Sequence, residues 1–102
     1  MVKKKRRVLE LTEFKVKGTH EEDEVKKASD KANSFIEEQP GFEHRMILRD
    51  KSKWLDAIQW RNIDYAKQAK KEMKKSEKCQ NYLKLISEKS INSNFPELVK
   101  MY

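Results

Sequence analysis

The segment from Phe42 to Trp60 alternates in character twice, and this pattern constrains the fold more than any other part of the chain. Residues 42–49 place Phe, His, Met and Leu on one side and Glu, Arg, Ile and Arg on the other. Residues 54–60 alternate again, after the polar stretch 50–53. Period-two alternation is typical of strands, and a short polar break between two such runs predicts a β-hairpin.

A helix is expected on the N-terminal side of this hairpin. Apolar residues recur at helical spacing over residues 25–36. Thr19 and Glu22 have the spacing of a capping box, in which each side chain bonds the backbone near the other, and this pair would start the helix. Pro40 and Gly41 are expected to end the helical stretch.

The C-terminal half repeats the order of helix and strand. Asn62 or Asp64 can cap a second helix, and Ser76 predicts a break followed by a fresh helix start. Strands are expected over residues 8–16 and 91–95, which gives the order βαββαβ. The sequence therefore predicts an α+β, ferredoxin-like fold with a four-stranded antiparallel sheet.

Length and composition predict one domain, residues 8–102, behind a basic N-terminal arm, residues 1–7. The chain has 102 residues, of which 36% are hydrophobic and 40% charged, so its core is small. Homodimerisation would hide more apolar surface. The arm holds five of the positive charges, and without them the net charge falls from +7 to +2. The arm is expected to be a solubilising end or a contact for nucleic acid or an anionic surface.

The cysteine content, the lack of long apolar stretches and the lack of binding motifs limit the expected location and cofactors of the protein. The single cysteine, Cys79, excludes an internal disulfide, and no stretch resembles a signal peptide or a membrane span. A soluble, cytoplasmic protein that does not enter membranes is expected. No cluster has metal-ligand spacing and no glycine-rich phosphate loop occurs, so no metal and no cofactor are expected.

Short motifs accompany the order of the elements. Residues 39–45 read Gln-Pro-Gly-Phe-Glu-His-Arg, residues 54–60 read Trp-Leu-Asp-Ala-Ile-Gln-Trp, and residues 75–79 read Lys-Ser-Glu-Lys-Cys. In order and spacing they resemble the antibiotic biosynthesis monooxygenase-like (ABM) family over residues 8–95. The resemblance implies a dimeric α+β barrel, in which two sheets pack face to face and each subunit holds a pocket between its sheet and helices. Members of this family include oxygenases that need no metal or flavin, so the resemblance implies an activity of that kind.

The resemblance divides the hairpin into a pocket side and an interface side. A turn at residues 50–53 would pair Arg49 with Trp54 and His44 with Gln59. The more apolar face, which carries His44, is expected to meet the helices. The pocket candidates are therefore His44, Gln59 and Met46, and the helices could add Tyr65 and Tyr82.

The opposite face is expected to meet the second subunit, where its charges could pair across the sheets. Its residues are Arg45, Arg49, Trp54, Asp56 and Trp60. The haem-degrading branch of the family uses an asparagine in the first strand and a histidine and a tryptophan in the second helix. This chain has none of them there, so haem degradation is not expected.

Three functions follow as expectations. In the first, His44 takes a proton from a small aromatic phenol, and the electron-rich anion reacts directly with oxygen. In the second, the protein is a dimer that binds a small ligand, or has a structural role, without catalysis. In the third, Trp54 and Trp60 stack on RNA bases, although Asp56 between them would repel phosphate and makes a nucleic-acid partner unlikely.

Overall fold

A computed structural model describes residues 5–102 of the protein; Lys3 and Lys4 of the basic arm lie outside the described residues. The elements follow the chain in this order: β1 (Val8–Phe14), α1 (Glu22–Ile36), β2 (Phe42–Asp50), β3 (Lys53–Trp60), α2 (Ile63–Lys75), α3 (Glu77–Leu85), a 3-10 turn (Glu88–Ser90) and β4 (Asn92–Asn94). The strands form one antiparallel sheet in the order β2-β3-β1-β4. This is the predicted ferredoxin-like α+β architecture.

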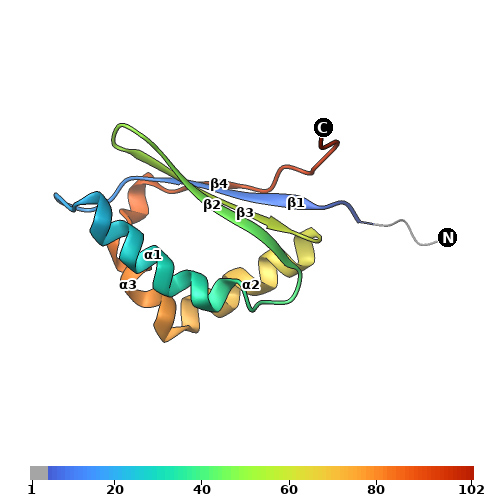
Figure 1. Ribbon diagram of the computed structural model, residues 1–102, viewed down its shortest axis with the longest axis horizontal. Helices are drawn as coiled ribbons and strands as arrows, with labels where there is room; N and C mark the ends of the chain where they lie inside the picture. Colours follow the sequence, from blue (N-terminus) through green and yellow to red (C-terminus); the bar gives the residue numbers. More distant parts are fainter. Residues whose placement is uncertain (1–4) are drawn as a thin grey trace.

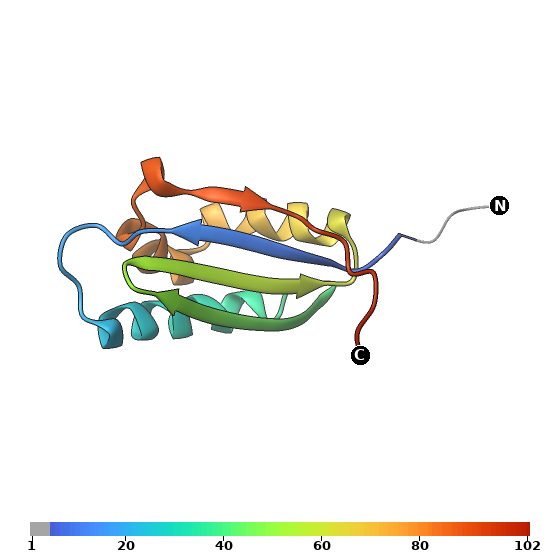
Figure 2. The ribbon, with the colours of Figure 1, turned by 90° about the horizontal axis from the view of Figure 1, so that it is seen from above.

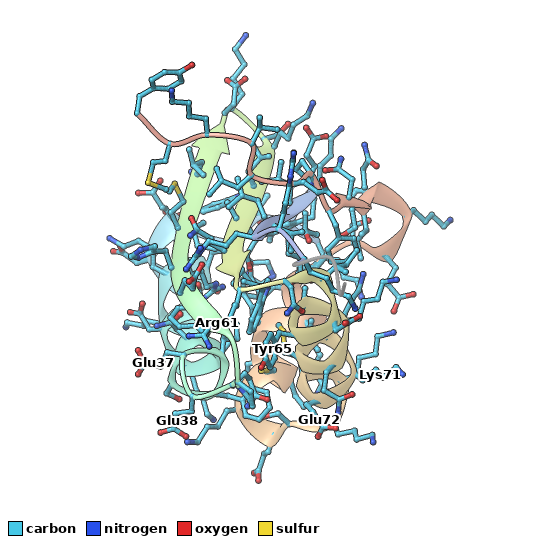
Figure 3. The ribbon with its side chains drawn as sticks, turned by 90° about the vertical axis from the view of Figure 1, so that its right-hand side faces the viewer. Glu37, Glu38, Arg61, Tyr65, Lys71 and Glu72 are labelled. Atoms are coloured by element: carbon cyan, nitrogen blue, oxygen red, sulfur yellow. The ribbon has the colours of Figure 1, made fainter. Side chains whose placement is uncertain are left out.

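The helices lie together on one side of the sheet, and no helix or strand of residues 5–102 lies on the other side (Figure 1). Seen from above, α1 runs beneath the β2 edge and α2 beneath the β1 and β4 edge (Figure 2). An end-on view shows the same two layers, with Tyr65 of α2 pointing between the helices and Lys71 pointing outward (Figure 3). Among residues 5–102, no helix has the length and apolar character needed to cross a membrane.

The hairpin register is as predicted. Arg49 pairs with Trp54 and His44 pairs with Gln59, with an irregularity between Phe42 and His44. The tight turn is completed by Lys51, whose φ of 58° is left-handed. Because the turn and the alternation both fix the pairing, the register follows from the sequence alone.

The helix boundaries are partly as predicted. Asn62 caps α2, where its side-chain oxygen accepts from the backbone N–H groups of Asp64 and Tyr65 at 3.0 and 3.3 Å. Ser76 marks the break between α2 and α3. The predicted cap at Thr19 is wrong, because α1 begins at Glu22 with Glu21 as its N-cap.

Strands β1 and β4 are shorter than expected. β1 ends at Phe14, beyond which Val16 makes only an isolated bridge to Ile86. β4 covers only Asn92–Asn94. Pro96, just beyond it, lacks a backbone donor. Its carbonyl still accepts from the backbone N–H of Leu9 at 2.9 Å, and Glu97 makes an isolated bridge to Val8.

The predicted direction of the two sheet faces is wrong. The helices cover the face that carries Trp54, Asp56 and Trp60, which are 5%, 6% and 0% exposed. Phe14 of β1 is buried on the same face, opposite Trp54. Large aromatic side chains bury more apolar area than Met or Leu, so this face gains more from contact with the helices.

Gly41 closes the connection between α1 and β2. Its φ of +82° is left-handed, and a Cβ at this position would overlap the ring of Tyr65. Its carbonyl accepts from the backbone N–H of Arg61 at 2.8 Å. Next to it, the ring of Phe42 meets that of Trp60 edge-on at 5.9 Å. Tyr65 therefore packs against the backbone at this end of the sheet.

Candidate functional site

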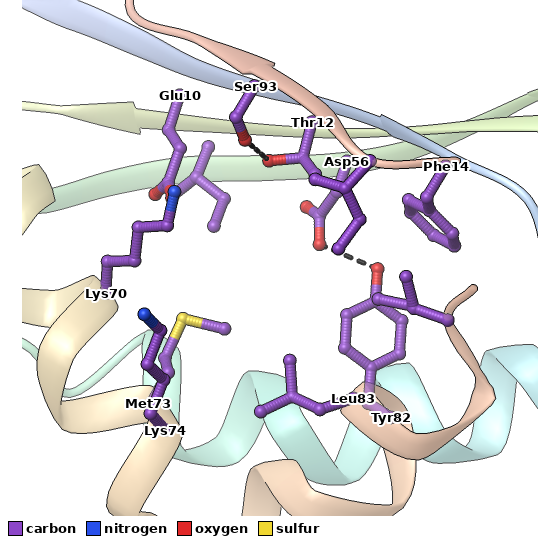
Figure 4. Close-up of a pocket in the computed structure, with 13 residues that line it drawn as sticks. Glu10, Thr12, Phe14, Asp56, Lys70, Met73, Lys74, Tyr82, Leu83 and Ser93 are labelled. Atoms are coloured by element: carbon purple, nitrogen blue, oxygen red, sulfur yellow. Dashed lines mark hydrogen bonds between the residues drawn. The ribbon is translucent and has the colours of Figure 1, made fainter. Parts of the chain in front are cut away.

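A cavity of about 160 Å³ lies between the covered face of the sheet and helices α2 and α3 (Figure 4). Its wall is mostly apolar, with Phe14 and Ile58 from the sheet and Met73, Leu83 and Ile86 from the helical side. Its polar lining comes from a few side chains: Glu10, Thr12, Asp56, Lys70, Lys74, Tyr82 and Ser93. A mostly apolar cavity with a few convergent polar groups is the usual form of a small-molecule site.

Asp56 stands at the centre of a buried polar network. Arg45 donates to both of its carboxylate oxygens, from Nε at 3.0 Å and from Nη2 at 2.9 Å. The hydroxyl of Tyr82 donates to Asp56 Oδ2 at 2.8 Å. The Arg45 and Asp56 side chains are only 5% and 8% exposed. Two N–H groups of one guanidinium and one hydroxyl group donate to this carboxylate, so it links β2, β3 and α3.

The same network fixes the helices. Arg45 Nη1 donates to the backbone carbonyl of Ser29 in α1 at 3.1 Å, and its guanidinium lies over the ring of Tyr82 in α3. Burial, together with the charge of Asp56, raises the pKa of Tyr82 well above its usual value. Tyr82 therefore remains a protonated donor at neutral pH.

Glu10 is the side chain best suited to proton transfer. It is 5% exposed and its Oε1 accepts from Trp60 Nε1 at 3.0 Å. Burial raises the pKa of Glu10; the hydrogen bond from Trp60 and the charge of Lys70 lower it, while the charge of Asp56 raises it further. A carboxyl group with a raised pKa that lines an apolar cavity is a typical general base.

Sequence reasoning missed Glu10, although a signal was present. Alternation in β1 places Glu10 on the same face as Val8 and Phe14, both of which are buried. An acid between buried apolar residues on one strand face must be paired or have a shifted pKa.

The predicted pocket residues of the hairpin do not line the cavity. His44, Met46 and Gln59 lie on the opposite face of the sheet, so the prediction that they face the helices is wrong. Met46 is 56% exposed, and Gln59 donates to Glu43 at 2.9 Å. Of the predicted helical candidates, Tyr82 lines the cavity and Tyr65 does not.

The residues predicted to form an interface lie in the interior of the single chain. Trp54, Asp56, Trp60 and Arg45 are in contact with the helices or with one another, so they cannot pack against a second sheet. Arg49 lies on the same side at the hairpin end, with its guanidinium 5.0 Å from the ring centre of Trp54. The charges that suggested a contact between subunits are paired inside one chain.

The uncovered sheet face is apolar at its centre. Leu11 pairs with Ala57, and Met46 pairs with Ala57 from the other side. Leu48 pairs with Leu55 and is 45% exposed. Six apolar residues form this open face: Leu9, Leu11, Met46, Leu48, Leu55 and Ala57.

Other reactive groups contribute little to the site. Cys79 is buried in the core, and burial raises the pKa of its thiol, so the thiol is protonated at neutral pH. Within the part of the chain that the structure describes, no group of three or more His, Cys, Asp or Glu side chains is placed to hold a metal ion.

Comparison with known proteins finds solved structures that share this fold. No protein-family model matches this chain, and no curated protein matches it in sequence. SnoaB, a cofactor-independent oxygenase from Streptomyces nogalater, matches with a TM-score of 0.76 and 16% identity, over 94% of this chain and 96% of that one. A proposed antibiotic biosynthesis monooxygenase from Bordetella bronchiseptica matches with a TM-score of 0.79 and 11% identity, over 94% and 100%.

A further proposed monooxygenase of the same kind, from Caulobacter crescentus, matches with a TM-score of 0.70 and 12% identity, over 95% of this chain and 93% of that one. At such identities the likeness concerns the fold, which several functions can share. The sequence motifs and the structure thus agree, and this chain has the ferredoxin-like α+β fold of the antibiotic biosynthesis monooxygenase-like proteins.

Proposed function

We propose that this chain is a small homodimeric protein that binds a single-ring phenol in its cavity and oxidises it with O₂, using no metal or flavin. The observation that carries the proposal is Glu10, a buried carboxyl group with a raised pKa that lines an apolar cavity. The fold that it shares with SnoaB, a cofactor-independent oxygenase, supports the reaction class.

The size of the cavity limits the substrate. Its volume is about 160 Å³, and an apolar protein cavity of about 150 Å³ holds benzene. One aromatic ring with small substituents therefore fits. The ring would lie against Phe14, Ile58 and Leu83, with a hydroxyl group directed to Glu10.

The chemistry follows from the loss of one proton. Glu10 takes the phenol proton, and the para carbon of the electron-rich anion bonds to O₂ and forms a peroxide. The ring C–H proton then leaves and the O–O bond breaks. One oxygen atom becomes the second carbonyl of a para-quinone, and the other leaves as water with the two protons. Phenol plus O₂ thus gives quinone plus water, with no external reductant.

Oxygen uptake with a panel of monocyclic phenols that carry a hydrogen at the para carbon tests this proposal. The wild-type protein is expected to consume O₂, and Leu83→Phe, which fills the cavity, is expected to reduce uptake strongly. His44→Ala, on the other face of the sheet, is the matched control and is expected to keep the activity. The reverse pattern would return the role of base to His44, and ligand binding without oxygen uptake would support a non-catalytic binding protein.

The open face is the basis for proposing a homodimer. Its apolar side chains cover the centre of the sheet, and no element within residues 5–102 covers them. A contiguous apolar patch of this kind marks an interaction surface. A second copy offers the same patch and would allow the two sheets to pack about 10 Å apart.

Leu55→Lys is expected to convert the dimer to a monomer of about 12 kDa. The substitution places a charge in the middle of the apolar contact, where it would be desolvated without a partner. Gln68→Lys adds the same charge on the exposed side of α2 and should leave the dimer intact. Sedimentation at micromolar concentration measures both variants. A monomeric wild-type protein would contradict the homodimer, and a Leu55→Lys variant that stays dimeric would contradict this interface.

The RNA-binding alternative loses the residues on which it depended. Trp54 and Trp60 are 5% and 0% exposed beneath the helices, so they cannot stack on bases. In the basic arm, Arg7 Nε donates to Glu43 at 2.9 Å, so this charge is already paired.

A further inference from the structure

The charges that line the cavity are distributed unevenly. Lys70 and Lys74, one turn apart on α2, both line it, and Figure 4 shows them rising from the helix on the side of Glu10. On the opposite side lie Asp56 and Tyr82, already bonded to each other. One end of the cavity therefore has two lysines, and the other has a satisfied polar network.

The lysines at this end exceed the negative charge available to them. Among residues 5–102, neither Lys70 nor Lys74 lies within 4.0 Å of a carboxylate oxygen. Asp56 is neutralised by Arg45. The charge of Lys70 acts on Glu10, so an ionised Glu10 balances one of the two lysines and leaves the other without a negative partner. The cavity therefore has unmatched positive charge where α2 meets β4.

Further basic residues around the cavity add to its positive charge. Residues 61–78 contain seven Lys and Arg side chains and three acids, and the lysines on the outside of α2 are exposed. A cleft lined by charge of one sign raises the local concentration of an oppositely charged ligand. A neutral phenol gains no charge–charge attraction from this arrangement when it binds.

We propose that the ligand is a hydroxylated aromatic carboxylate, with its ring in the apolar cavity and its carboxylate on Lys70 and Lys74. This inference rests on the proposed function and names the substrate class. The volume admits one ring, so the acid group would be attached to the ring directly or through one carbon. Ammonium groups bind carboxylates through charge-assisted hydrogen bonds, which are stronger than neutral ones.

Binding measured by calorimetry without oxygen tests the inference separately from turnover. The ligands are 2-hydroxyphenylacetate, its methyl ester and phenol. The acid is expected to bind about tenfold more tightly than the ester, as two partly shielded ion pairs would give. The preference should decrease between 0.05 and 0.5 M salt.

The variants localise the effect. Lys70→Met with Lys74→Met is expected to remove the preference for the acid and to leave ester binding within about twofold. Lys71→Met, on the outward side of α2, is the matched control and should keep the preference. Equal binding of acid and ester by the wild type, or a preference that survives the double substitution, would overturn the inference and leave the phenol site standing. Failure of all three ligands to bind would count against the proposed function itself.

Discussion

Glu10→Gln is expected to lower oxygen uptake about 10²–10⁴-fold, the usual contribution of a general base. The amide has nearly the same size, and its oxygen can still accept from Trp60 Nε1, the partner of Glu10 at 3.0 Å. Only the capacity to take a proton is lost. Oxygen electrode traces with the best substrate of the panel measure the effect, and Glu13→Gln, on the uncovered side of β1, is the control that should retain activity.

The same substitution is expected to stabilise the protein at neutral pH. Burial raises the pKa of Glu10 above its usual value of 4.5, so the folded state holds this proton more strongly than the unfolded state. The resulting stabilisation is fully present below pH 4.5 and is lost as the pH rises through the raised pKa. Glutamine does not titrate and escapes this loss.

Urea unfolding across this pH range measures the difference. The advantage of Glu10→Gln should be absent below about pH 4.5, the usual carboxyl pKa, and should increase until Glu10 is fully ionised. In the wild type, oxygen uptake should rise over the same interval, because only the carboxylate accepts a proton. Unchanged uptake in Glu10→Gln would remove Glu10 as the base, and a pH-independent difference in stability would contradict the raised pKa.

The sequence predicts the pairing of the strands better than the direction of their faces. The hairpin register follows from the polar turn and from alternation on both sides of it. Alternation also separates two faces, but it does not decide which face the helices cover. In the hairpin, one face presents Met46 and Leu48 and the other presents Trp54 and Trp60. A count of apolar residues underestimates the area that the indole rings of the second face can bury.

The first strand contains the information that decides between the faces. Val8 and Phe14 align with the tryptophans, because they pair directly with Trp60 and Trp54. Once β1 is placed beside β3, the aromatic face becomes the larger apolar surface. The cavity and the role of Glu10 depend on this placement and on the packing of α2 and α3, which short-range patterns do not specify.

The charges of the hairpin were misleading for a related reason. Arg45 and Asp56 lie diagonally on neighbouring strands, and exposed pairs of this kind contribute little to stability. The structure buries this pair beneath α1 and α3 and adds Tyr82 and the carbonyl of Ser29 as partners. A buried charge survives only with such partners, and the sequence does not show that the helices supply them.

Asp56→Ala is expected to destabilise the fold by about 3–5 kcal/mol, the usual cost of removing one partner of a buried ion pair. The guanidinium of Arg45 would remain buried without its carboxylate, and Tyr82 would lose the acceptor of its hydroxyl. A small domain has a total stability of about 5–15 kcal/mol. The variant should therefore unfold at a much lower urea concentration.

Two further variants separate the causes. Tyr82→Phe removes only one hydrogen bond to a charged group and should cost about 1.5–3 kcal/mol at most. Arg45→Met combined with Asp56→Leu removes both charges and should recover most of the stability lost in Asp56→Ala. A double variant no more stable than Asp56→Ala would show that packing, and not the unpaired charge, causes the loss.

The location of the pair gives one more test. Arg45 and Asp56 are partners within one chain, so the cost of Asp56→Ala should persist in the monomeric Leu55→Lys background. If instead the pair joined two subunits, the cost would disappear once the subunits were separated. Urea unfolding of the Leu55→Lys protein, with and without Asp56→Ala, distinguishes the two arrangements. Because this ion pair is buried beneath the helices, the open face is the sheet surface available to the proposed second copy.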